Sequence, residues 1–272
     1  MTATVESTSN EAAADRKVPL VELRNVGKSY GNITALKDIS LRVYPGQVTG
    51  ILGDNGAGKS TLIKIIAGLH QQTEGELLVD GEATKFSSPA DALGKGIATV
   101  YQNLAVVPLM PVWRNFFLGQ EVRKKSFPWS LDANAMRATT LTELSKMGIE
   151  LPDVDAPIGS LSGGQRQCVA IARAVFFGAR VLILDEPTAA LGVKQSGVVL
   201  KYITAARDAG FGVVFITHNP HHAHMVGDHF VLLNRGRQKL DCTYDEISLE
   251  HLTQQMAGGD ELQALSHELG RK

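Results

Sequence analysis

One glycine-rich segment of the sequence restricts both the fold and the ligand. Residues 53–60 read Gly-Asp-Asn-Gly-Ala-Gly-Lys-Ser and fit the spacing G-x-x-x-x-G-K-[ST] at every fixed position. A strand-like run (47–52) precedes the segment and a helix-like run (61–67) follows it. Glycines let the backbone turn tightly and point successive N–H groups inward, and the helix presents its positive end to the same anion. The pattern predicts a loop that holds the phosphates of a nucleoside triphosphate, and a chance glycine-rich turn is the weaker interpretation.

The positions of this loop have distinct expected roles. We expect Lys59 to reach the β- and γ-phosphates and the hydroxyl of Ser60 to bind Mg²⁺. The remaining positions would contact the nucleotide through their backbone or short side chains. They are Gly53, Asp54, Asn55, Gly56, Ala57, Gly58 and Thr61.

Composition and charge limit the classes of protein to which this chain can belong. Of its 272 residues 44% are hydrophobic and 20% are charged, which is ordinary for a soluble globular protein. The net charge of −1 and the single basic run at 123–125 give no support for nucleic acid as a partner. The two cysteines, Cys168 and Cys242, fit no metal or redox spacing, and we expect Cys168 in the core. Without a long apolar run, any membrane role would come through a partner protein.

The order of apolar patterns along the chain predicts an α/β protein. Residues 19–52 alternate apolar positions with turns, which favours antiparallel strands. Between about 103 and 173 apolar residues recur at helical spacing. Continuous apolar runs at 181–184 and 213–216 are typical of parallel strands that are buried on both faces. We expect a disordered segment at 1–18, a main domain at 19–245 and a helical tail at 246–272.

Two acidic residues end the first of these apolar runs. Asp185 and Glu186 directly follow it and precede Pro187. Ligands of open α/β sheets lie at the carboxyl ends of the strands. We therefore expect Asp185 to hold Mg²⁺ and Glu186 to orient and polarise the water that attacks phosphate. A plain acidic loop that caps a strand is the weaker alternative.

A second turn with glycines begins a helical stretch. It consists of Leu161, Ser162, Gly163, Gly164 and Gln165. A serine and two glycines at the start of a helix form an anion-binding nest, although such a turn taken alone is more often a simple helix cap. Because the sequence shows one phosphate loop and no internal repeat, the second nest would serve a different molecule.

Together these segments closely resemble the ATP-binding cassette (ABC) family of ATPases over residues 21–236. Residues 53–60 resemble the family's Walker A motif, 161–165 its signature motif and 181–186 its Walker B motif. The resemblance implies an α/β fold with a RecA-like P-loop NTPase core, an antiparallel β subdomain and a helical subdomain inserted at about 103–173. It also implies that the cofactors are ATP and Mg²⁺.

The resemblance assigns roles to three further residues. Gln102 matches the glutamine that contacts Mg²⁺ and the membrane partner, and His218 matches the switch histidine. Tyr30 matches the aromatic residue that stacks on adenine. By this resemblance the catalytic residues are Lys59, Gln102, Glu186 and His218, and the Mg²⁺ ligands are Ser60, Gln102 and Asp185.

The family resemblance also implies a homodimer that sandwiches two ATP molecules. Residues 162–164 of each chain would face the γ-phosphate that the other chain binds. One position departs from the family, because Gly192 stands where an aspartate usually follows Walker B. The contact that this aspartate makes between the two sites would therefore be missing, and coupling of the two hydrolysis events would weaken. Catalysis itself should survive.

Strings outside the catalytic motifs resemble the ribose, xylose and fructose class of sugar-import ATPases. They lie at 96–102, 117–119, 234–236 and 256–259. Most members of that class carry two cassettes, whereas this sequence carries one, like the fructose-type members. The resemblance implies an ATPase that energises monosaccharide uptake from the cytoplasmic face of the inner membrane. Its partners would be integral membrane permease subunits and an extracytoplasmic sugar-binding protein.

Two other functions would use the same chemistry. An exporter or lipid-extraction ATPase is often fused to membrane spans, which this sequence does not show. An ABC ATPase that acts on DNA or ribosomes typically has coiled-coil insertions, zinc-binding cysteines or two cassettes, none of which is visible.

Two groups of side chains leave alternatives open. For the five histidines between 218 and 229, a surface helix is favoured over a metal site. We expect Trp113 and Trp129 to pack in the helical lobe or to form a docking face.

Overall fold

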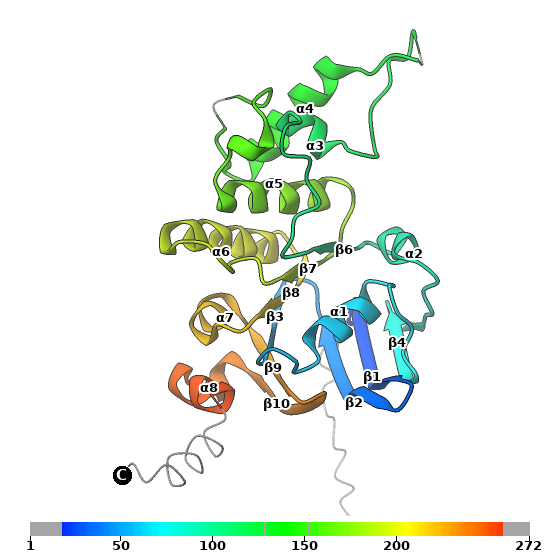
Figure 1. Ribbon diagram of the computed structural model, residues 1–272, viewed down its shortest axis with the longest axis vertical. Helices are drawn as coiled ribbons and strands as arrows, with labels where there is room; N and C mark the ends of the chain where they lie inside the picture. The colour runs from blue at the N-terminus through cyan, green and yellow to red at the C-terminus, as the bar shows by residue number, and fades with distance from the viewer. Residues whose placement is uncertain (1–17, 128, 152, 258–272) are drawn as a thin grey trace, which may run out of the picture.

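The computed structural model describes residues 18–127, 129–151 and 153–257. The segment expected to be disordered, 1–18, therefore lies outside the described residues except for Val18, and the tail expected at 246–272 is described only to Ala257. Two sheets and the helices around them make up the described chain (Figure 1). No helix in these ranges is long and apolar enough to cross a membrane.

The smaller sheet is antiparallel and comes from the N-terminal part of the chain. Its strand order is β2 (Ile33–Val43), β1 (Val21–Tyr30), β4 (Glu74–Val79) and β5 (Glu82–Ala83). The antiparallel strands expected within 19–52 are confirmed for β1 and β2. The last strand of that range, β3 (Gln47–Leu52), instead pairs parallel in the larger sheet. Glu22 on β1 is buried, and Arg24 and Arg42 donate hydrogen bonds to it at 2.7 and 2.9 Å. These two bonds lower the pKa of Glu22, so its buried charge is compensated.

The larger sheet has six strands, and its five parallel strands carry the residues that matter for function. The strand order is β10 (Arg237–Thr243), β9 (His229–Asn234), β3 (Gln47–Leu52), β8 (Gly212–Thr217), β7 (Val181–Asp185) and β6 (Ile97–Val100). Only β10 pairs antiparallel, and it closes one edge in a hairpin with β9. The apolar runs expected to form buried parallel strands are β7 and β8, as predicted.

Alternate side chains of the parallel strands enter two different hydrophobic cores, as the two-residue period of a strand requires. Ile183 and Val214 face the core that contains the smaller sheet and α1 (Lys59–Ile66). Leu184 and Phe215 face the opposite core, which contains α5 (Gly163–Phe176) and α6 (Val193–Asp208). Cys168 on α5 is fully buried in the second core, as the sequence predicted. Figure 1 shows α5 and α6 stacked above the large sheet.

The helical part of the chain lies beyond α5. It contains α3 (Val112–Phe116), α4 (Ala133–Lys146) and a short 3₁₀ turn at Ile158–Ser160. Phe116 is fully buried, and its ring lies 5.4–6.2 Å from those of Phe117, Phe176 and Phe177. Trp113 is also buried and donates a hydrogen bond to Asp155, so the expectation that it packs is confirmed. The described residues 117–127 and 129–132 form no helix, which limits the helical texture predicted for this region.

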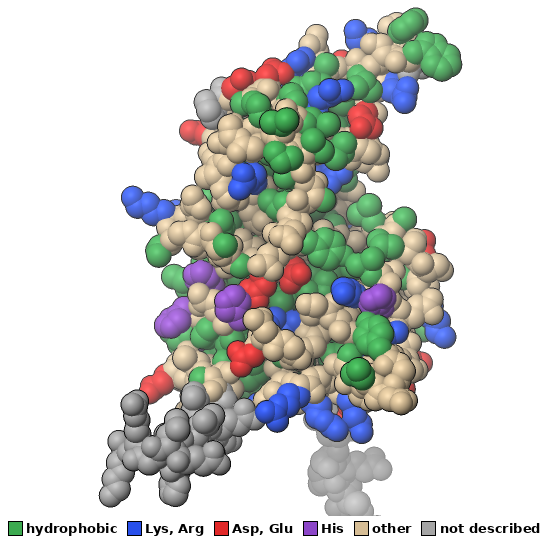
Figure 2. All heavy atoms as spheres, viewed as in Figure 1, with side chains coloured by type: hydrophobic (Ala, Val, Ile, Leu, Met, Phe, Trp, Pro, Cys, Tyr) green, Lys and Arg blue, Asp and Glu red, His purple; other side chains and the backbone are tan. Residues whose placement is uncertain are grey.

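The remaining helices are short and lie around the large sheet. They are α2 (Pro89–Gly94), α7 (Pro220–Val226) and α8 (Leu249–Met256), with a second 3₁₀ turn at Tyr244–Glu246. Pro220 occupies the first turn of α7, where a proline costs no hydrogen bond. His218 precedes this helix, whereas His222 lies on it, so the two side chains do not share a helix face. Figure 2 shows histidine side chains gathered on the surface over α7.

Replacement of Phe116 by alanine tests the aromatic core of the helical part. Truncating this fully buried ring should lower the free energy of unfolding by about 3–5 kcal/mol, because it leaves a cavity among three other rings. Phe127, which is 58% exposed, is the matched control, and Phe127→Ala should change stability by less than about 0.5 kcal/mol. Urea denaturation measures both values, and equal effects would mean that Phe116 does not anchor this core.

Candidate functional site

The glycine-rich loop joins β3 to α1 at the carboxyl edge of the large sheet. Its glycines are required by the backbone: Gly53 has φ +143° and Gly58 has φ +107°. A Cβ at Gly53 would lie 2.4 Å from the carbonyl oxygen of Leu233, so no larger residue fits there. The loop packs against the turn after β9, and Gly236 donates its N–H to the carbonyl of Ala57 at 2.9 Å. This conformation agrees with the phosphate loop that the spacing predicted.

Lys59 is the first residue of α1, and its ammonium group is held inside the loop. The side chain is 8% exposed, and Nζ donates to the carbonyl oxygens of Gly53 and Asp54. Burial lowers the pKa of Lys59, although the nearby carboxylates of Glu186, Asp54 and Asp185 oppose the shift. The hydrogen bonds of Nζ go to backbone carbonyls, and the carboxylate of Glu186 is 3.9 Å away, so a phosphate oxygen could take the place of these weaker partners. The predicted contact with phosphate therefore fits the electrostatics of the loop.

Asp185 ends β7 and Glu186 follows it in a left-handed backbone conformation, with φ +48°. The side chain of Glu186 is 11% exposed, and its Oε1 lies 3.9 Å from Nζ of Lys59. Burial raises the pKa of Asp185, and the neighbouring charge of Glu186 raises it further. Left-handed backbone in a residue other than glycine costs about 1–3 kcal/mol and is concentrated at functional sites.

His218 follows β8 and reaches the same carboxylate. Its Nδ1 lies 2.9 Å from Oε2 of Glu186, and its side chain is 58% exposed. The two atoms are close but form no hydrogen bond, and Oε2 has no hydrogen-bond partner among the described residues. A buried carboxylate oxygen without a partner can accept a hydrogen bond from an incoming group. The structure thus brings together Lys59, Glu186 and His218, which come from three separate parts of the sequence.

The adenine-stacking role expected for Tyr30 has a defined setting. Tyr30 ends β1, is 41% exposed, and has its ring 5.7 Å from that of His70. Nζ of Lys28 lies 5.0 Å from the centre of the Tyr30 ring and donates to the carbonyl of Gln71 at 2.7 Å. Lys28 thus covers one face of the ring, and a base would stack on the other. Sequence reasoning missed Lys28, although two-residue spacing on a strand places it on the same face as Tyr30.

The signature turn forms a capped helix end. The hydroxyl of Ser162 accepts a hydrogen bond from the N–H of Gln165, and the Gln165 side chain accepts one from the N–H of Ser162. This capping box explains both residue types by helix stability alone, the alternative that the sequence left open. Packing favours glycine at position 163, because a Cβ added there would lie 2.6 Å from the side chain of Leu191. Leu161 and Gly164 complete the turn, and Gly164 is buried against Gln195.

Gln102 lies in a cleft of about 490 Å³ that also contains part of the signature turn. The lining of this cleft includes Gly163, Glu186 and Leu191. Gln102 follows β6, and Glu186 follows the neighbouring strand β7, so both extend from the same edge of the sheet. Gly192, where the family usually has an aspartate, is the N-cap of α6 and makes no side-chain cap.

The residues predicted to bind Mg²⁺ were tested against the environment that the structure gives them. Ser60 is exposed on the first turn of α1, and Asp185 lies at the end of β7. Hydroxyl, carboxylate and amide oxygens, the last from Gln102, are the hard donors that Mg²⁺ prefers. Burial and then the neighbouring charge of Glu186 raise the pKa of Asp185, and a divalent cation would offset both effects by stabilising the carboxylate. The donor set therefore fits the ion.

Comparison with known proteins identifies the family. Residues 36–189 match the ABC transporter family. A xylose/arabinose import ATP-binding protein from Sulfolobus acidocaldarius is 42% identical over 87% of this chain and 93% of its own length. A fructose import ATP-binding protein from Rhizobium meliloti is 44% identical over 81% and 86%. This chain belongs to the ABC transporter family of ATP-binding proteins.

Solved structures agree with this assignment. A dimeric ATP-binding cassette bound to ADP and Pi superposes with a TM-score of 0.69 and 29% identity, over 82% of this chain and 98% of the cassette. The ADP conformation of another ABC transporter cassette gives a TM-score of 0.73 at 25% identity, over 88% and 95%. The predicted α/β cassette fold is therefore confirmed.

One contact near the site has no signal in the sequence. Oγ1 of Thr188, in the loop after Glu186, lies 3.0 Å from Nδ1 of His222 on α7. Burial is the main cause that lowers the pKa of His222, and His221 and His218 add to it. The contact joins the loop that follows β7 to helix α7, although the two residues are far apart in the chain. No motif or spacing could have indicated this pair.

Gly53→Ala tests whether the loop conformation requires glycine. The added Cβ would overlap a backbone oxygen and force a φ that only glycine adopts, so we expect a loss of more than about 3 kcal/mol in stability and loss of ATP binding. Gly56→Ala is the matched control, because its Cβ would meet nothing within 4 Å and its φ of +84° should cost about 1–2 kcal/mol. Urea denaturation measures the stability of both variants and a fluorescent ATP analogue measures binding by Gly53→Ala, and similar stability losses in both variants would contradict the overlap.

Proposed function

We propose that this chain is the ATP-hydrolysing subunit of an importer that takes up a monosaccharide through a separate membrane permease. The convergence of Lys59, Glu186 and His218 at one sheet edge carries the ATPase part of the proposal. The import part rests on relatives of 38–44% identity that are named for import of xylose and arabinose, fructose, or ribose. Neither an exporter nor a DNA-acting ATPase has comparable support.

In the proposed reaction water attacks the γ-phosphorus of ATP, and the bond to the β-phosphate oxygen breaks to give ADP and phosphate. Glu186 accepts a hydrogen bond from the water through its unpartnered Oε2 and takes up the proton as the new bond forms. His218 lies 2.9 Å from the same oxygen, beside the position that the water would occupy, and Lys59 binds the phosphate oxygens. Mg²⁺, held by Ser60, Gln102 and Asp185, would supply charge neutralisation for the phosphates.

A homodimer would complete two nucleotide sites. The N-terminus of α5, which the residues 162–164 form, would face the γ-phosphate bound by the partner subunit, with Leu161 and Gln165 beside it. Its capped helix end leaves free N–H groups and a positive dipole that suit phosphate. The dimeric relative bound to ADP and Pi supports this arrangement. The two subunits would close together when ATP binds and separate after hydrolysis, and this motion would be the mechanical step of transport.

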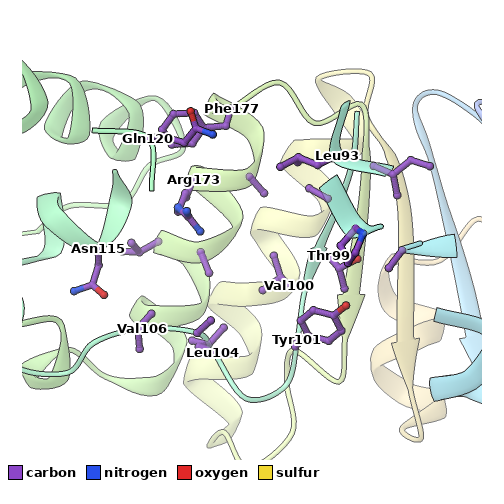
Figure 3. Close-up of a pocket in the computed structure, with 18 of the residues that line it drawn as sticks. Leu93, Thr99, Val100, Tyr101, Leu104, Val106, Asn115, Gln120, Arg173 and Phe177 are labelled. Atoms are coloured by element: carbon purple, nitrogen blue, oxygen red, sulfur yellow. The ribbon is translucent and has the colours of Figure 1, made fainter. Parts of the chain in front are cut away.

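An apolar groove of about 280 Å³ is the proposed docking site for the permease (Figure 3). Leu93 from α2, Tyr101 after β6, and Arg173 and Phe177 at the end of α5 contribute to it. Nε and a terminal nitrogen of Arg173 donate to the carbonyls of Phe116 and Leu118 at 3.0 and 2.7 Å. The groove suits an apolar helix of a membrane protein, because most of its lining is hydrophobic.

The segment 103–115, which follows Gln102, contributes to this docking site. Leu104, Val106 and Asn115 line the groove, whereas Gln102 lines the neighbouring cleft with Glu186. Leu104 and Val106 line both cavities. Asn115 stabilises the segment, because its side chain accepts from the N–H of Val107 and donates to the carbonyl of Met110. This segment would therefore connect the permease to the hydrolysis site.

The location and the remaining partner follow from the importer. Docking on the permease would hold the chain as a peripheral subunit at the cytoplasmic face of the inner membrane. An extracytoplasmic binding protein would deliver the sugar on the other side. Because the sugar does not touch this subunit, its residues do not distinguish one monosaccharide from another.

Glu186→Gln should separate ATP binding from hydrolysis. The amide keeps the shape of the side chain but cannot accept the proton, so we expect the turnover number to fall by at least about 10²-fold while ATP binding persists. Phosphate release and equilibrium binding of ATP measure the two properties. Glu150→Gln, at an exposed position, is the control and should hydrolyse ATP normally. Normal turnover by Glu186→Gln would remove this residue from its proposed role.

Leu93→Asp should test the docking groove. A carboxylate in the apolar groove would be desolvated by the permease, so co-purification of membrane-spanning subunits from detergent extracts should be lost while basal ATPase activity remains. Leu141→Asp on α4 is a close match, since Leu93 is 46% and Leu141 47% exposed. Equal recovery of the permease with both variants would refute docking at this groove.

A further inference from the structure

A short hairpin formed by residues 122–127 and 129–132 projects beyond α4 and carries exposed aromatic rings (Figure 1). Arg123 pairs with Leu131 in an antiparallel bridge, and Lys124 donates its N–H to the carbonyl of Ser130 at 3.0 Å. Figure 1 shows this hairpin as the outermost part of the helical region, at the upper right. The hairpin plays no part in the ATPase site or the docking groove described above.

Two large aromatic side chains at the tip of the hairpin are exposed to solvent. Trp129 is 82% exposed and Phe127 is 58% exposed, whereas the other tryptophan, Trp113, is buried. Figure 2 shows hydrophobic side chains at this end of the molecule with basic side chains close by. Uncovered aromatic rings are unfavourable in water and mark surfaces that are covered in a complex. The expectation that Trp129 packs in the helical lobe is therefore wrong, whereas the docking alternative stays a prediction.

Basic side chains lie beside these rings. Arg123, Lys124 and Lys125 are consecutive and exposed, and the sequence from Val122 to Leu131 contains no acid. The flanking acids are engaged at the base of the hairpin. Glu121 accepts the N–H of Gly119, and Asp132 caps α4 by accepting the N–H of Ala135. The tip therefore combines positive charge with an amphipathic tryptophan.

We propose that this hairpin tip binds the surface of an anionic phospholipid membrane. Tryptophan rings prefer the headgroup level of a bilayer, where the apolar body and the polar N–H are both satisfied. Lys124 and Lys125 would lie near lipid phosphates, which attract basic residues that flank a membrane contact. Trp129 and Phe127 insert at the headgroup level. This lipid contact goes beyond the proposed importer function and does not require the permease.

Vesicle flotation with the purified full chain tests this proposal. The chain should float with vesicles of phosphatidylcholine and phosphatidylglycerol in equal parts, bind phosphatidylcholine vesicles less, and lose binding at high salt. Lys124→Gln with Lys125→Gln should weaken binding to the mixed vesicles by about 30-fold. Phe127→Ser with Trp129→Ser should weaken it by at least about tenfold, because the inserted apolar area is lost.

Controls separate the tip from general surface effects. Met225→Ser with Lys201→Gln removes one exposed apolar side chain and one exposed cation elsewhere, and should leave vesicle binding unchanged. Tryptophan emission should shift to shorter wavelength on adding mixed vesicles, and this shift should disappear in Trp129→Ser. All tip variants should hydrolyse ATP normally, so a failed vesicle experiment would leave the ATPase proposal intact.

Two results would overturn the proposal. One is equal flotation of the tip variants and the unmodified chain. The other is absence of vesicle binding together with reduced recovery of membrane-spanning subunits by the tip variants, which would show that the tip contacts protein.

Discussion

The hydrogen-bonded register of three parallel strands is the constraint on which the functional site depends. Leu52 on β3 pairs with Thr217 on β8, and Asp185 on β7 pairs with Ile216, so the three strands end at one level. The phosphate loop, Glu186 and His218 therefore begin at the same edge of the sheet. Because each strand is buried on both faces, a shift in register would move apolar side chains out of both cores, which stabilises the alignment.

The charges at this edge are arranged before any ligand binds. Burial lowers the pKa of Lys59 and raises that of Asp185, so each group is less stable in its charged form than in water. Glu186 and Ala190 both have positive φ, at +48° and +59°, in the loop that follows β7. Such strain is retained where a fold over-determines its backbone, and here it aims Glu186 between Lys59 and His218.

Helix α5 connects the two proposed ends of the mechanism. Its first turn carries the capped signature residues, and Arg173 and Phe177 at its other end line the docking groove. A helix transmits displacement along its length because its hydrogen bonds resist bending. The groove and the cleft beside Glu186 also share Leu104 and Val106. Rotation of the helical part would therefore move both the first turn of α5, which would face the partner subunit, and the residues beside Glu186.

The sequence by itself determined the local features of this protein. The phosphate loop, the strands β7 and β8 and the acidic pair after β7 were predicted, because fixed glycines and apolar periodicity act over a few residues. Only the tertiary structure decided the contacts between distant segments, including Glu186 with His218 and Thr188 with His222. It also decided that Trp113 is buried and Trp129 exposed, although both lie in the same stretch. Such contacts depend on strand order and packing, which no local pattern encodes.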